Sequence, residues 1–158
     1  IPGWGSTVGE TTLEESLDPE LLRAGFPLQV YLQETMDPDM PAMDQLLYLN
    51  EELFRMIENK VSVELLARLL STQLVTKSEK HLLDHDRTYY RLLRSIFSEG
   101  QQSGEFGTAF SVNEMVKTFA LWERAVLYDW CLVGGEYALG RYAADMMPTF
   151  LEGYRTRR

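Results

Sequence analysis

Apolar residues recur at intervals of three and four positions along much of the chain, which is the spacing of one face of an α-helix. Residues 41–59, 62–75 and 86–103 all show this pattern. No run of alternating β-branched residues predicts a strand. The sequence therefore predicts an all-α fold.

Residue types at the ends of these segments set the predicted helix boundaries. Asp37 or Asp39 is expected to cap the first helix, and Ser62 is expected to cap the second, because short polar side chains satisfy free backbone N–H groups. Gly104 and Gly107 should end the third helix, since glycine readily adopts the left-handed conformation of a helix end.

Two further helices are predicted at residues 112–133, where Ser111 is a good N-cap, and at residues 136–154. The first has two adjacent apolar stripes, made of Val112, Met115, Phe119, Trp122, Val126, Trp130 and Val133, and of Val116, Ala120, Leu127 and Cys131. In the second, apolar side chains cover roughly twice the usual arc of a surface helix, and Pro148 is expected to kink it. These two helices have more apolar surface than ordinary surface helices. A central helical hairpin in a monomer or an interface between subunits would bury it.

A glycine-containing turn precedes these two helices. It reads Glu99-Gly100-Gln101-Gln102-Ser103-Gly104-Glu105-Phe106. This order resembles the C-terminal domain of tetracycline-repressor-like (TetR family) transcription regulators, in which an E-G-Q-x-x-G-[ED]-[FIL] turn precedes two dimer-forming helices. The resemblance covers the second half of the chain well and residues 40–86 in outline.

The resemblance implies a homodimer held by a four-helix interface, with the last two helices of each subunit. It also implies a helical cavity for a small apolar or aromatic effector, whose binding shifts the protein between two states. The residues expected at the dimer interface are Val116, Leu127, Leu139, Ala143, Met146, Met147, Phe150 and Tyr154.

Two polar residues stand on otherwise apolar helix faces. Asn50 lies among apolar residues of the first helix, and Glu123 lies between the two stripes of the penultimate helix. Asn50 is expected to hydrogen-bond to the backbone or to water, and Glu123 is expected to contact solvent or an arginine. The alternative for each residue is that its side chain orients a ligand. The predicted ligand-binding residues are Asn50, Phe54, Ile57, Tyr89, Leu93, Phe97, Phe119, Trp122, Glu123 and Val126.

Complete members of the family begin with a basic helix-turn-helix unit, which residues 1–40 do not match. Arg23 is the one cation there, and the chain starts at Ile1, so we expect a fragment or processed form that reaches DNA only through an absent N-terminal domain. We expect residues 1–40 to form a loop and short helices, and residues 41–158 to form the effector-binding and dimerisation domain.

Composition narrows the class of protein further. With 158 residues and 45% apolar content, the chain suits one domain. Its single cysteine excludes an internal disulfide. No apolar stretch approaches the ~20 residues that span a bilayer. We therefore expect a cytoplasmic protein without membrane contact.

The sequence offers little catalytic chemistry, because it contains no nucleophile elbow, phosphate-binding glycine loop or CxxC pair. We expect no enzymatic activity and no cofactor. His81 and His85 are four apart with Asp84 and Asp86 beside them, so they fit either an exposed loop or a metal site. An all-helical adaptor module and a small metal-dependent helical enzyme are the alternatives to a regulator.

The net charge of −9 predicts that this chain does not bind DNA by itself, because it repels polyphosphate. In a gel-shift assay at physiological salt, we expect no complex with promoter DNA. Specific sub-micromolar binding would contradict both the charge argument and the domain assignment.

Overall fold

The computed structural model describes residues 36–75 and 87–157. They form α3 (Ala42–Lys60), α4 (Val63–Val75), α6 (Arg87–Gln102), α7 (Val112–Leu132) and α8 (Leu139–Glu152). Within these residues the extended pairing is limited to an isolated antiparallel bridge between Phe106 and Arg155. The predicted all-α class is confirmed.

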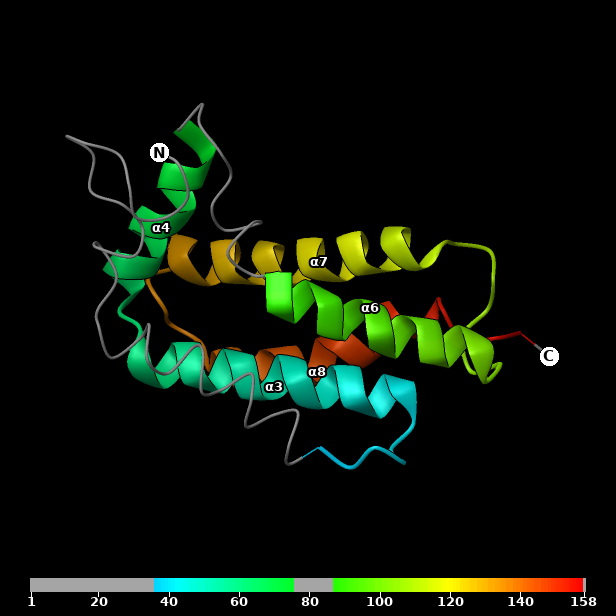
Figure 1. Cartoon of the computed structure of the whole chain (residues 1–158). Coiled ribbons are helices and arrows are strands. Elements are labelled where there is room, and N and C mark those ends of the chain that lie inside the picture. The colour runs from blue at the N-terminus through cyan, green and yellow to red at the C-terminus, as the bar shows by residue number, and fades with distance from the viewer. Residues whose placement is uncertain (1–35, 76–86, 158) are drawn as a thin grey trace.

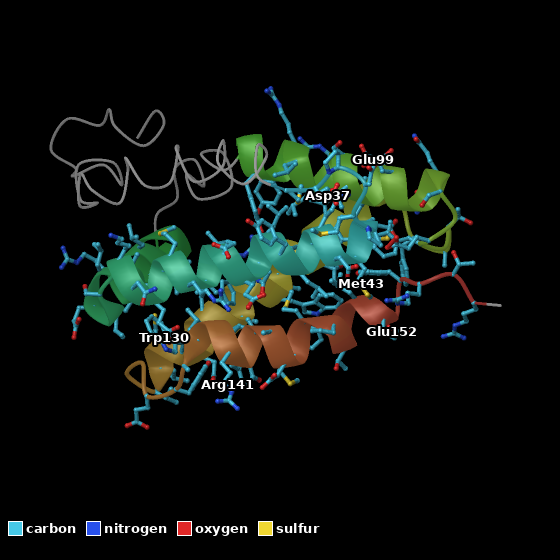
Figure 2. The ribbon with its side chains drawn as sticks, turned by 90° about the horizontal axis from the view of Figure 1, so that it is seen from below. Asp37, Met43, Glu99, Trp130, Arg141 and Glu152 are labelled. Carbon is cyan, nitrogen blue, oxygen red and sulfur yellow. The ribbon has the colours of Figure 1, made fainter. Side chains whose placement is uncertain are left out.

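Four of the helices, α3, α6, α7 and α8, lie alongside one another, and α4 stands across one end of the group (Figure 1). Helix α3 packs along α8, and α6 packs against both α3 and α7. Figure 2 shows Met43 and Glu152 toward one end of the α3 and α8 pair and Trp130 toward the other. The arrangement is a helical bundle.

Two serine caps form as the sequence predicts. The Ser62 hydroxyl accepts a hydrogen bond from the Leu65 N–H at 3.1 Å, and the Ser111 hydroxyl accepts one from the Glu114 N–H at 3.1 Å. Each serine therefore satisfies one of the free N–H groups at the start of its helix.

The predicted aspartate cap of α3 is wrong. Pro41 occupies the N-cap position without a side-chain hydrogen bond, and Asp37 accepts from the Asp39 N–H instead. The cap comes from the distant Glu105, whose carboxylate accepts hydrogen bonds from the N–H groups of Ala42 at 3.0 Å and Met43 at 2.7 Å. A negative charge at this position also interacts favourably with the helix dipole.

A second long-range carboxylate caps α8. Glu58, near the end of α3, accepts from the Leu139 N–H at 2.7 Å and the Gly140 N–H at 3.4 Å. This explains why α8 begins at Leu139, later than the predicted residue 136. The helix then continues through Pro148 to Glu152.

The turn after α6 is shaped by two glycines. Gly104 adopts a φ of +81°, the left-handed conformation expected at a helix end. The Phe106 side chain folds back over Gly100, and the Phe106 N–H donates to the Gly100 carbonyl at 2.9 Å. The Phe106 side chain is 1% exposed and its ring lies 5.5 Å from that of Phe97, so this turn closes one end of the core.

We expect Gly100→Ala to destabilise the protein by about 1–3 kcal/mol, because the added Cβ would lie 2.7 Å from Phe106 Cε2 and 3.1 Å from Ala42 Cβ. Gly153→Ala is the matched control, since the nearest neighbour of its added Cβ is at 3.8 Å. Urea unfolding of both variants gives the measurement. Equal free energies of unfolding would contradict the role assigned to Gly100.

Candidate functional site

Three polar side chains from three helices meet inside the bundle. The Asn50 Nδ2 amide on α3 donates a hydrogen bond to Glu123 Oε2 on α7 at 2.8 Å. The Tyr89 hydroxyl on α6 lies 2.9 Å from Oε2 and 3.0 Å from Oε1 of the same carboxylate. We call Asn50, Tyr89 and Glu123 the polar cluster.

The polar cluster is almost completely shielded from solvent. Asn50 is 1% exposed, Glu123 is 4% exposed and Tyr89 is 8% exposed. Moving a carboxylate out of water costs several kcal/mol unless hydrogen bonds compensate, so its donors must be held in place. The amide and the phenol do this from two different helices, which fixes α3 and α6 relative to α7.

The cluster bears on two expectations. The Asn50 amide donates a hydrogen bond to the side chain of Glu123, and Glu123 is buried and not at the solvent-exposed surface. The sequence placed both residues and Tyr89 in one candidate site without predicting that they bind one another. Helical periodicity shows which face a residue occupies, but it does not show which residue of another helix lies opposite.

The other predicted ligand-binding residues lie in the interior, with one exception. Phe54, Ile57, Leu93, Phe97, Phe119 and Val126 are buried, and Trp122 is half-buried. Trp122 stacks on Phe150 with ring centroids 4.7 Å apart, and it also contacts Tyr154. The Phe97 ring lies 6.0 Å from Tyr154, so Phe97 and Trp122 belong to an aromatic cluster that includes residues of α8 and the segment after it.

Most of the residues predicted at a dimer interface are covered by the chain itself. Leu139, Ala143 and Met147 are each 0% exposed, because α8 packs along α3. Val116, Leu127 and Tyr154 are also buried, whereas Met146 and Phe150 are half-buried. These six buried side chains belong to the core of one chain, so a second copy would have to contact other residues.

Sequence reasoning missed a third apolar face of α7. Leu121, Tyr128 and Leu132 are large and exposed, and Ala125 between them is exposed as well. They repeat at intervals of four, three and four positions, so the sequence contained the pattern. The seven-residue stripe of the same helix, from Val112 to Val133, carries more apolar residues and dominates its pattern.

Other reactive groups in the described residues do not gather into a site. Within residues 36–75 and 87–157, no three His, Cys, Asp or Glu side chains lie close enough to hold a metal ion. His81 and His85, which the sequence offered as a possible metal site, lie outside the described residues.

Two other groups have raised pKa values. Burial raises the pKa of the half-buried Cys131 thiol. Burial together with a hydrogen bond to Asp129 raises the pKa of Tyr137.

No helix in the described part of the chain is long and apolar enough to cross a membrane. Neither a protein-family model nor a curated protein sequence matches the chain. The likeness to the TetR family therefore depends on the residues of the Glu99–Phe106 turn and on the helices that follow it.

Removing one donor should test the energetic role of the polar cluster. We expect Tyr89→Phe to lower the free energy of unfolding by about 1–3 kcal/mol, because Glu123 loses a hydrogen bond in the interior. Tyr90→Phe is the control, since the Tyr90 hydroxyl is half-buried and accepts from Arg124 at 3.1 Å. If the two variants lose equally small amounts of unfolding free energy in thermal or urea unfolding, the buried hydrogen bond of Tyr89 makes no specific contribution to stability.

Proposed function

We propose that this chain is the effector-binding and dimerisation domain of a TetR-like transcription regulator. The observation that carries the proposal is the polar cluster, in which an amide, a phenol and a carboxylate from three helices meet within an apolar and aromatic interior. Sites for small molecules combine these two features, since apolar walls supply affinity and a few polar groups fix orientation. The Glu99–Phe106 turn supports the family assignment.

The effector we expect is a small apolar or aromatic compound with one polar group. Its polar group would exchange hydrogen bonds with Asn50 or Glu123, and its apolar part would pack against side chains such as Phe54 and Phe119. Because the cluster joins α7 to α3 and α6, altering one of its bonds changes how these helices pack. A ligand with different affinity for two such packings shifts the population between them.

In the proposed regulator, this shift alters the separation of two DNA-binding heads in a homodimer. Contact with DNA belongs to a helix-turn-helix unit outside this sequence. The chain contributes binding and a change of population, and it performs no chemical reaction.

A protein-interaction module is the second candidate function. The exposed apolar side chains of Leu121, Tyr128 and Leu132 favour it, because any apolar partner could cover them. The two candidates differ in whether a small molecule binds near the polar cluster.

We expect at least one member of a panel of aromatic amines, alcohols and carboxylates to raise the melting temperature of the protein. Glu123→Gln should weaken that compound by about 1–3 kcal/mol in calorimetric titration, because it alters the acceptor while keeping the side-chain shape. Glu99→Gln is the control, since Glu99 is exposed at the end of α6. If no compound stabilises the protein, or if both variants bind alike, the effector assignment fails.

A further inference from the structure

The outward side of α7 carries large apolar side chains that are exposed. Leu121 is 52% exposed, Tyr128 is 53% exposed and Leu132 is 70% exposed. With the exposed Ala125 between them, they follow one another at intervals of four, three and four residues. At 1.5 Å per residue this row is about 16 Å long. Its spacing matches alternating a and d positions of a heptad, so it fits a helix laid along α7.

Cationic side chains border this apolar row on the side of α6. Lys117 is exposed and precedes Leu121 by four positions. Arg124 is half-buried and lies three positions after Leu121 and four before Tyr128. Residues three and four apart are neighbours on a helix surface, so both cations flank the row. Arg124 Nη1 donates a hydrogen bond to the Tyr90 hydroxyl at 3.1 Å, which places this edge of the row beside α6.

Helix α6 adds cations to the same edge. Helices α6 and α7 pack against each other and run in opposite directions (Figure 1). Arg94 is exposed one turn after Tyr90, so it lies toward the part of α7 that carries Lys117. Arg91 is exposed as well. We call the following residues the α6–α7 face: Arg94, Lys117, Leu121, Arg124 and Tyr128.

The cations of the α6–α7 face are not neutralised by carboxylates. Within residues 36–75 and 87–157, Arg94, Lys117 and Arg124 form no ion pair. The acids on the exposed side of α7 are Glu114 in its first turn and Asp129, which already accepts a hydrogen bond from a tyrosine hydroxyl. Because acids outnumber bases in the whole chain, a group of cations without acidic partners beside exposed apolar side chains is a specific feature of this face.

We propose that the α6–α7 face binds an acidic amphipathic helix of a protein partner. Apolar side chains of the partner helix would cover Leu121 and Tyr128, and its glutamates or aspartates would pair with Lys117, Arg124 and Arg94. Recognition of an amphipathic helix by an apolar surface is a recurring mode of binding. Opposite charges at the margin select the partner and fix its orientation.

The range of electrostatic interactions favours a single helix over a bilayer or a nucleic acid. At physiological salt the field of a surface charge is screened within about 8 Å. A helix on the α6–α7 face therefore interacts mainly with the cations of that face, whereas an extended anionic surface also meets the rest of a chain with a net charge of −9. The inference goes beyond the effector site, because the polar cluster lies on the inward side of α7.

Fluorescence anisotropy with a labelled synthetic peptide tests the proposal. The probe is a helical peptide of about three heptads, with leucine at the a and d positions and glutamate at the e and g positions. The control peptide has lysine in place of each glutamate. We expect the glutamate peptide to bind the wild type at micromolar concentration and the lysine peptide to bind at least roughly tenfold more weakly. Equal binding leaves an apolar interaction surface but rejects the acidic partner, and no binding of either peptide also overturns the proposal.

Charge reversal on the protein tests which residues act. Lys117→Glu should weaken the glutamate peptide roughly tenfold, and Lys117→Arg should retain its binding. Arg141→Glu is the matched control, since Arg141 is exposed on α8 outside the α6–α7 face and its reversal changes the net charge equally (Figure 2). Leu121→Ser should also weaken the peptide roughly tenfold, because it removes apolar contact. Equal effects of Lys117→Glu and Arg141→Glu, in variants with unchanged melting temperatures, would contradict the assigned face.

Two other occupants of the α6–α7 face would give different results. Vesicles made of equal parts phosphatidylserine and phosphatidylcholine that bind the wild type, while the glutamate peptide does not, would assign the face to a membrane. A wild-type dimer in sedimentation velocity that Leu121→Ser converts to a monomer would assign it to a second copy of the chain. Either result rejects the proposal.

Discussion

The buried carboxylate of Glu123 is the constraint on which the inside of this bundle depends. At 4% exposure it needs donors, and Asn50 and Tyr89 supply them from α3 and α6. Hydrophobic packing alone tolerates small sliding of one helix along another, but a hydrogen bond of 2.8 Å does not. The hydrogen bonds from Asn50 and Tyr89 therefore set the relative placement of the three helices.

Two other carboxylates act at the ends of helices. Glu105 caps α3, and Glu58 caps α8, in each case across a long stretch of sequence. Glu105 belongs to the turn in which Phe106 covers Gly100. The motif that resembles the TetR family therefore has a structural role, because it ends α6, caps α3 and places an aromatic ring in the core. Its residues are explained by folding, and the functional proposal depends on the polar cluster instead.

Helix α7 has a different role on each side. Its inward side contributes Glu123 to the polar cluster, while its outward side carries the exposed side chains of Leu121, Tyr128 and Leu132.

The sequence determined which segments are helical and where several begin, because periodicity and serine caps act over a few neighbouring residues. Ser62, Ser111 and Gly104 have the roles that their residue types predict. The sequence also named the members of the polar cluster, since a polar residue on an apolar face is visible from periodicity alone.

Only the tertiary structure decided which residues meet. It joined Asn50 to Glu123, replaced the expected aspartate cap of α3 with Glu105, and placed Ala143 and Met147 in the core of a single chain. It also left Leu121, Tyr128 and Leu132 of α7 exposed. These outcomes depend on contacts between segments far apart in the chain, and such contacts are set by the packing of all the helices together and not by the local sequence.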